Sequence, residues 1–212
     1  RGVLLMPEGI TRADLAPAEK IVTAARAVLG AIDFDPYSTP KINEMVMAAK
    51  FTNRLVHTVD EACTGDWVIR GEGRVFLNPP AMAYISRRLL NKALREYRAG
   101  RVKQLLVVLN HNETLTKCPW IWDYPVCMPF KRIRPTYWDD EVEMFRAISP
   151  SDWSLVFYLP PIENAMEHEA RLSRFNTMFC EFGRVIMNER SGEGDWEKPW
   201  ESTYKKPYNY RD

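Results

Sequence analysis

Short apolar runs alternate with amphipathic segments along most of this chain, and the alternation predicts its architecture. The runs expected to form strands cover residues 31–35, 55–59, 74–77, 104–109, 153–159 and 184–187. The segments with apolar residues three and four positions apart, expected to form helices, cover residues 17–29, 40–50, 83–99 and 163–182. Strands that alternate with helices are typical of βαβ units. We therefore expect an α/β fold, with a mostly parallel, twisted sheet and helices on both faces.

Glycines and prolines set the expected boundaries of these elements. Gly30 and Gly100 follow two of the helices as C-terminal caps do, and Pro36 is expected to stop the strand at 31–35. The outer face of the helix at 83–99 is expected to be basic, with Glu96 against Arg87, Arg88, Lys92, Arg95 and Arg98. Such a face suits nucleic-acid phosphates, and an ordinary solvated helix face has the same composition.

The pattern fades in two places. Residues 111–150 are irregular and hold several aromatic rings, which suits an insert that recognises a target. The last stretch, 189–212, combines Gly, Glu, Lys and Pro with Trp196, Trp200, Tyr204, Tyr208 and Tyr210. We expect a single domain over residues 1–188, and a tail at 189–212 whose rings lie against a protein partner.

Composition narrows the class of protein. Apolar residues make up 46% of the 212 positions, enough for a core, and a net charge of +1 excludes polyelectrolyte-like binding but not a local basic patch. The four cysteines and three histidines lack metal-ligand spacing, so we expect reduced thiols, no metal and a cytoplasmic protein. No apolar run is long enough for a membrane span, and no signal peptide is evident.

The sharpest chemical signal is the stretch Asn78-Pro79-Pro80, directly after an apolar strand. Each proline fixes its own φ and keeps the preceding residue out of the helical region, so this arm should be stiff and extended. The Asn78 side-chain carbonyl and the Pro79 backbone carbonyl could accept the two N–H bonds of an exocyclic amine such as that of adenine. This would aim the nitrogen lone pair at a methyl donor without prior deprotonation. A Pro-Pro turn without a chemical role is the alternative.

Short acidic and hydroxyl side chains near two other strands suit a nucleoside cofactor. The candidates are the carboxylates of the stretch Asp33-Phe-Asp-Pro-Tyr-Ser38, at the end of an early strand, and Asp60, at the end of the next. A carboxylate there could pair with an ammonium group or with ribose hydroxyls, although aspartates also serve as plain turn residues. Because the carboxyl ends of parallel strands share one edge of a sheet, we expect these groups and Asn78 to converge on one crevice.

The order and spacing of these pieces resemble the phage- and prophage-type DNA N6-adenine methyltransferases, loosely called phage Dam-like proteins. The resemblance covers about residues 16–187. It rests chiefly on Ala24-Ala-Arg-Ala-Val-Leu-Gly30, Ile32-Asp-Phe-Asp-Pro-Tyr-Ser38, Phe51-Thr52, Asp60-Glu61, Val75-Phe-Leu-Asn-Pro-Pro80 and Phe175-Asn-Thr-Met-Phe-Cys-Glu-Phe-Gly183.

The resemblance implies a Rossmann-like, S-adenosylmethionine-dependent methyltransferase fold in the cytoplasm of a bacterial host, in a phage or prophage context. It implies that Asp33, Asp35, Pro36 and Ser38 face the cofactor and that Asn78, Pro79 and Pro80 face the target amine. It also implies that the target base is flipped out of the DNA duplex into the pocket.

The chain departs from the family pattern at three points. The aromatic residue that usually follows the two prolines, and stacks on the flipped base, is Ala81 here. Tyr84 could fill the gap, or it is an ordinary aromatic at the start of a helix. The turn after the strand at 104–109 reads Asn110-His-Asn-Glu-Thr-Leu-Thr116 in place of an Arg and a Thr-Asp pair, and Ala16-Pro17 lacks a neighbouring aromatic.

Three functions are compatible with this sequence. The first is methylation of adenine N6 in DNA, with Lys131, Arg132 and Arg134 neutralising phosphates. The second is a catalytically weakened or inactive descendant, kept as a nucleic-acid-binding or assembly module in a phage-related complex. The third is methylation of cytosine N4, since the same amide geometry suits any exocyclic amine.

Overall fold

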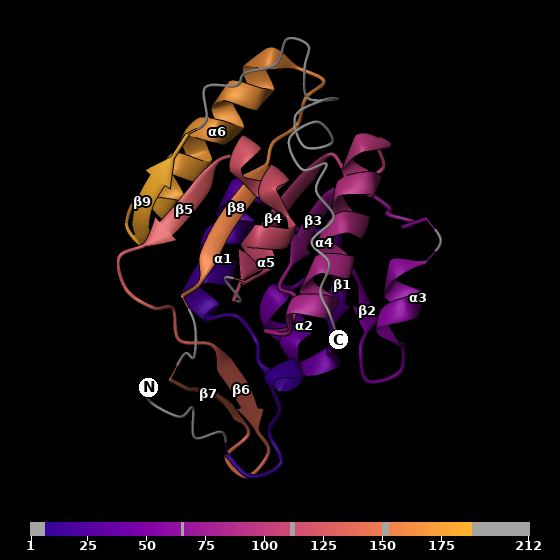
Figure 1. Ribbon diagram of the computed structural model, residues 1–212, viewed down its shortest axis with the longest axis vertical. Coiled ribbons are helices and arrows are strands. Elements are labelled where there is room, and N and C mark those ends of the chain that lie inside the picture. The colour runs from indigo at the N-terminus through magenta and orange to yellow at the C-terminus, as the bar shows by residue number, and fades with distance from the viewer. Residues whose placement is uncertain (1–6, 65, 111–112, 150–152, 188–212) are drawn as a thin grey trace, which may run out of the picture.

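A computed structural model describes residues 7–64, 66–110, 113–149 and 153–187 (Figure 1). Its centre is a seven-stranded sheet with the strand order β2-β1-β3-β4-β8-β5-β9. The strands are β1 (Phe34–Ser38), β2 (Lys50–Asn53), β3 (Arg74–Leu77), β4 (Gln104–Leu109), β5 (Val126–Pro129), β8 (Leu155–Leu159) and β9 (Gly183–Ile186). The first four are parallel, and the pairs β4–β8, β8–β5 and β5–β9 are antiparallel. Five of the seven strands therefore share one direction, as expected for a mostly parallel sheet.

Helices cover both faces of the sheet, which confirms the predicted α/β architecture. One face carries α1 (Glu19–Leu29), α2 (Pro40–Val46) and α6 (Ala165–Phe179). The other carries α3 (Val59–Cys63), α4 (Ala83–Arg98), α5 (Glu113–Lys117) and the 3-10 helix Pro119–Asp123. Figure 1 shows α4 and α1 on opposite sides of the central strands. A second 3-10 helix, Arg12–Asp14, lies near the N-terminus.

The central strands β3 and β4 are apolar after their first residues, Arg74 and Gln104, because both faces of these strands are buried. In β3, Val75 and Leu77 pack against the face that carries α4, and Phe76 packs against the face that carries α1. In β4, every residue from Gln104 to Leu109 is buried. A shift of one residue would exchange the two sets of side chains, so packing on both faces holds the register of these strands.

Two of the predicted boundaries are wrong. Pro36 does not stop the first strand, since β1 runs through it to Ser38. The β1–β2 register is irregular between Asp35 and Ser38, so the missing N–H of the proline is not needed for a ladder hydrogen bond there. The strand predicted at 55–59 is absent: β2 ends at Asn53, and Thr58 and Glu61 form a capping box that starts α3.

The predicted outer face of α4 is also partly wrong. Lys92 and Glu96 are buried, with 5% and 0% of their surface exposed. Glu96 pairs with Lys92 and with Arg101, and it accepts the backbone N–H of Trp67 at 3.2 Å. Burial alone would raise the pKa of Glu96, but the hydrogen bonds from Arg101 and Lys92 hold it below its usual value. This acid ties the end of α4 to two loops and does not face solvent.

The region at 111–150, which was expected to be irregular, contributes one strand to the main sheet and forms a second, smaller sheet. β5 pairs with β8 and β9, whereas β6 (Thr136–Asp139) and β7 (Met144–Ala147) form a separate two-stranded sheet. Thr136 also bridges to Ala16 near the N-terminus. An insert that recognises a target therefore stays a prediction, and so does the aromatic tail, since 188–212 lie outside the described residues.

The described part of the chain contains no helix with the length and apolar character of a membrane span. The four cysteines are free thiols, and Cys118 and Cys127 are buried.

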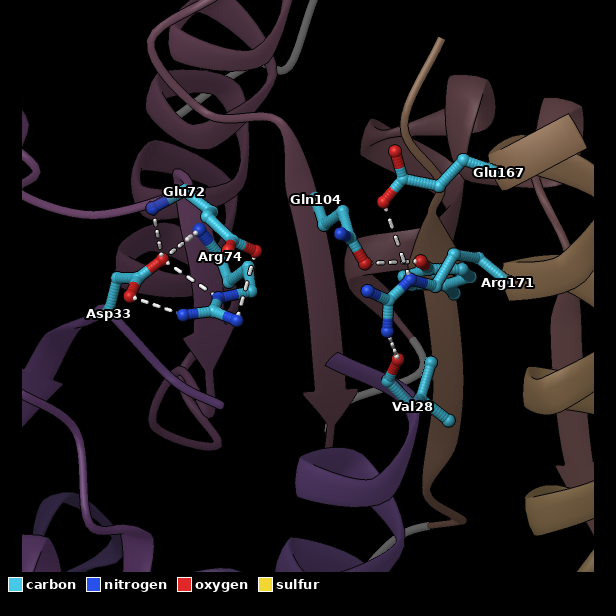
Figure 2. A network of polar contacts seen from close by, with 8 residues as sticks. Val28, Asp33, Glu72, Arg74, Gln104, Glu167 and Arg171 are labelled. Atoms are coloured by element: carbon cyan, nitrogen blue, oxygen red, sulfur yellow. Dashed lines mark hydrogen bonds and ion pairs between the residues drawn. The ribbon is translucent and has the colours of Figure 1, made fainter. Parts of the chain in front are cut away.

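An ion pair joins the amino ends of β1 and β3 (Figure 2). Arg74 donates from Nε and Nη2 to the two carboxylate oxygens of Asp33, both at 3.0 Å. Asp33 also accepts the backbone N–H groups of Glu72 and Arg74, at 3.0 and 2.9 Å. Burial alone would raise the pKa of Asp33, but these hydrogen bonds hold it below its usual value. The carboxylate thus has all its acceptor capacity in use.

We expect Arg74→Met to destabilise the protein by about 3 kcal/mol, because it leaves a buried carboxylate without its cation. Urea denaturation measures the loss. The double variant Asp33→Asn, Arg74→Met removes the charge as well and should lose less. Equal losses in the single and double variants would contradict this account of the pair.

Candidate functional site

The order of the strands reverses between β1 and β3. From β1 the chain passes through α2 on one face to β2, and from β3 it passes through α4 on the other face to β4, which lies on the opposite side. Such a reversal opens a crevice at the carboxyl ends of the two strands, where open α/β sheets bind ligands. The Cα pairing between β1 and β3 is confined to Phe34 and Val75, near their amino ends. The residues at the reversal are therefore Ser38 and Asn78.

A row of hydrogen-bonded polar side chains lies after the ends of β3 and β4 and before the start of the antiparallel strand β8. Asn110 Nδ2 donates to Asn78 Oδ1 at 2.9 Å, and Ser154 Oγ donates to Asn110 Oδ1 at 2.8 Å. Asn78 is 6% exposed. The amide of Asn78 thus lies in a protein environment and not on a free arm, and one lone pair of its carbonyl oxygen is already in use. Sequence reasoning assigned no role to Asn110 or Ser154.

The diproline arm leads from this row into α4. The Pro80 carbonyl accepts hydrogen bonds from Ser86 Oγ at 2.6 Å and from the Met82 N–H at 2.7 Å. The Pro79 carbonyl accepts none of the hydrogen bonds found among the described residues. The arm is therefore buried, with one carbonyl anchored and one without a hydrogen bond among the described residues.

Ala81, which stands where a stacking ring was expected, and Tyr84, which could replace that ring, differ in exposure. Ala81 is buried, whereas Tyr84, in the first turn of α4, is 62% exposed. The guanidinium of Arg88 lies 5.4 Å from the centre of the Tyr84 ring. Tyr84 is therefore accessible to a partner, and its predicted role stays a prediction.

Asp35 and Ser38 lie in β1 and are almost fully buried. Asp35 accepts the Tyr37 N–H at 3.1 Å, and burial raises its pKa from 3.8 to about 6. The Ser38 hydroxyl has no hydrogen bond of ordinary geometry, although it lies close enough to Asp35 to lower that pKa slightly. A costly carboxylate and an unsatisfied hydroxyl on one short strand are typical of a functional site.

Arg54 joins this group, and sequence reasoning missed it. It follows β2, its backbone N–H donates to the Ser38 carbonyl at 2.9 Å, and its guanidinium lies 5.2 Å from the centre of the Tyr37 ring. Burial lowers the pKa of Arg54, and the charges of Tyr37, Asp35 and Asp14 partly offset this. Arg54 makes no ion pair within the described ranges. No motif marks it, since only the pairing of β2 with β1 brings it here.

Two predicted cofactor contacts lie elsewhere. Asp33 precedes β1 and is held by Arg74 at the amino ends of the strands, opposite the end that carries Asn78. Asp60 lies within α3, is exposed and pairs with Arg88, because a turn and the start of α3 replace the strand expected before it. The expected convergence therefore holds only for the end of β1 and the end of β3.

Lys131, Arg132 and Arg134 lie in the loop between β5 and β6, and all three are exposed. Ile133 between them is buried in the core. The three exposed cations therefore flank a buried residue, and together they are called the positive patch. In the described ranges, no three His, Cys, Asp or Glu side chains are grouped as a metal ion would require.

A comparison with known protein families, with curated proteins and with solved structures finds no match for this chain.

The pKa of Asp35 predicts an unusual dependence of stability on pH. Because the folded protein keeps a proton on Asp35 up to about pH 6 and the unfolded chain loses it near 3.8, the free energy of unfolding falls as pH rises between these values. The full loss is roughly 3 kcal/mol. We expect Asp35→Asn to lack this loss and to be more stable than the natural protein at neutral pH.

Urea denaturation across this pH window measures the difference, with Asp140→Asn, an exposed turn residue, as the matched control. Parallel pH profiles for the natural protein and Asp35→Asn would show that Asp35 titrates normally.

Proposed function

We propose that this protein is an S-adenosylmethionine-dependent methyltransferase of Rossmann-like fold that acts on the exocyclic N6 amine of adenine in DNA. The observation that carries the proposal is the position of Asn78-Pro79-Pro80 at the carboxyl end of β3, beside the end of β1, where the strand order reverses. A ligand crevice is expected at this point from topology alone.

The arm supplies acceptors for an amine. The Asn78 carbonyl oxygen retains one lone pair beside its bond to Asn110, and the buried Pro79 carbonyl accepts no hydrogen bond in the described part of the chain. Two acceptors on a stiff backbone hold both N–H bonds of an exocyclic amine and direct its lone pair. The gain comes from orientation and electrostatics, and no residue has to remove a proton before the transfer.

Residues of β1, together with the residue that follows β2, fit the cofactor. The Asp35 carboxylate and the Arg54 guanidinium carry opposite charges, which suits the ammonium and carboxylate groups of an amino acid moiety. The Ser38 hydroxyl, buried and without a hydrogen-bond partner, is a further group that a polar ligand would satisfy. When bound, the cofactor supplies the methyl group. Pro36 belongs to the same strand segment.

Two sets of exposed side chains suit contact with DNA. The positive patch of Lys131, Arg132 and Arg134 would neutralise phosphates, and Tyr84 is exposed enough to stack on a flipped base. Flipping is required because the N6 amine lies inside the duplex stack.

A second function has its own support. Asn78 is buried and already hydrogen-bonded, and Ala81 leaves no ring directly after the prolines. Both features suit a chain that keeps the fold and binds nucleic acid, or assembles with a partner, without turnover.

We expect Asn78→Ala to abolish methylation and to leave the fold intact, since the variant removes the acceptor that orients the amine. Mass spectrometry of DNA from cells expressing each variant measures 6-methyladenine and 4-methylcytosine. Asn176→Ala, on the exposed face of α6, is the matched control and should retain full activity.

Full activity of Asn78→Ala would refute the role of the arm. If the natural protein binds S-adenosylmethionine in calorimetry but modifies no base, the second function, a binding or assembly module without turnover, replaces the proposed enzyme. If 4-methylcytosine appears alone, the substrate is cytosine.

Replacing Lys131, Arg132 and Arg134 together with Ala should weaken DNA binding most at low salt. Each phosphate contact contributes about 0.9 to the slope of log K against log salt, so the slope should fall by up to about 2.7. Fluorescence anisotropy over a salt series measures it. Removal of three other exposed cations, Lys20, Arg174 and Arg184, is the control and should leave the slope unchanged; equal effects of the two triple variants would exclude a specific patch.

A further inference from the structure

The row Ser154–Asn110–Asn78 connects three neighbouring strands of the sheet at one edge. Ser154 is 2% exposed and Asn78 is 6% exposed. The contacts are 2.8 Å between Ser154 Oγ and Asn110 Oδ1, and 2.9 Å between Asn110 Nδ2 and Asn78 Oδ1. Asn110 thus links the residue before β8 to the side chain at the start of the diproline arm.

Every member of this row can both donate and accept. A hydroxyl donates one hydrogen and accepts at two lone pairs, and a primary amide carries a carbonyl and an NH2 group. If both amides rotate by half a turn about their terminal bonds, Asn78 Nδ2 donates to Asn110 Oδ1 and Asn110 Nδ2 donates to Ser154 Oγ. The two hydrogen bonds are kept with opposite polarity.

The two polarities leave different groups of Asn78 free. In the observed arrangement the Asn78 carbonyl is directed at Asn110, so one of its lone pairs is in use. In the reversed arrangement the NH2 group of Asn78 faces Asn110 and both lone pairs of the carbonyl are free. Only the reversed arrangement offers the whole carbonyl to an N–H donor.

We propose that Asn110 is a positioning residue that, by exchanging the donor and acceptor of its amide, turns the Asn78 carbonyl toward an incoming exocyclic amine. This inference rests on the proposed methyltransferase function and adds a residue that touches neither cofactor nor substrate. Because the row keeps two hydrogen bonds when it reverses, the amine has only to select one of two hydrogen-bonded arrangements. Ser154 permits the reversal because its hydroxyl can either donate a hydrogen bond to Asn110 or accept one from it.

Two substitutions of similar size separate the arrangements. Asn110→Asp, ionised at about pH 8 where an ordinary carboxyl has lost its proton, can only accept. It therefore takes a hydrogen bond from Ser154 and one from Asn78 Nδ2, which holds the reversed arrangement. Asn110→Leu fills the same space but makes no hydrogen bond, so Asn78 loses its orienting partner.

The experiment measures steady-state methylation of a DNA substrate by the natural protein and both variants, with melting temperatures recorded for each. We expect Asn110→Leu to lower kcat at least about tenfold with KM for DNA unchanged, since only the geometry of the amine is disturbed. Asn110→Asp should restore kcat to within about threefold of the natural protein. A purely structural role for Asn110 would not give a loss in kcat alone that a charged residue repairs.

The outcomes distinguish this inference from the function on which it rests. If the natural protein methylates DNA and Asn110→Leu does so equally well, the positioning role is wrong and the methyltransferase stands. If Asn110→Asp is as slow as Asn110→Leu, polarity does not matter and the inference fails. If the natural protein methylates no base, the proposed function and this inference fail together.

Discussion

The register of β3 is the constraint on which the candidate site depends. β3 is four residues long, pairs with β4 along its whole length and is buried on both faces. A slip by one residue would place Phe76 on the wrong side of the sheet, so the strand has one stable position. Asn78 directly follows Leu77, and Pro79 restricts the backbone of Asn78 to extended conformations. The position of the strand therefore also fixes the position of Asn78.

The two ends of the sheet differ in how their polar groups are satisfied. At the amino ends, Asp33 has a complete set of partners, and its pKa lies below the usual value. Further along β1, burial raises the pKa of Asp35 to about 6, and at the carboxyl end of this strand the Ser38 hydroxyl has no hydrogen bond among the described residues. Both aspartates belong to the same short stretch of sequence, yet one stabilises the fold and the other costs stability. A carboxylate with a raised pKa and a hydroxyl without a hydrogen bond on one buried strand are the features that mark the candidate functional site.

The fold could be predicted largely from the sequence because apolar runs and helical periodicity are local signals. The diproline arm was also predictable, since proline acts on its own neighbours. The errors arose where local signals competed: the capping box at Thr58 overrode an apolar stretch, and β1 accommodated Pro36 at a register irregularity. Asn110, Ser154 and Arg54 could not be predicted, because their contacts join segments far apart in the chain. Asn78 and Asn110 are 32 positions apart, and Asn110 and Ser154 are 44 apart.

The most direct measurement is a crystal structure of the protein with S-adenosylhomocysteine at saturating concentration. The account predicts that the ligand lies between the carboxyl ends of β1 and β3, with its amino acid group near Asp35 and Arg54 and its sulfur directed toward Asn78. A ligand bound elsewhere on the protein, or no ligand bound at all, would contradict it.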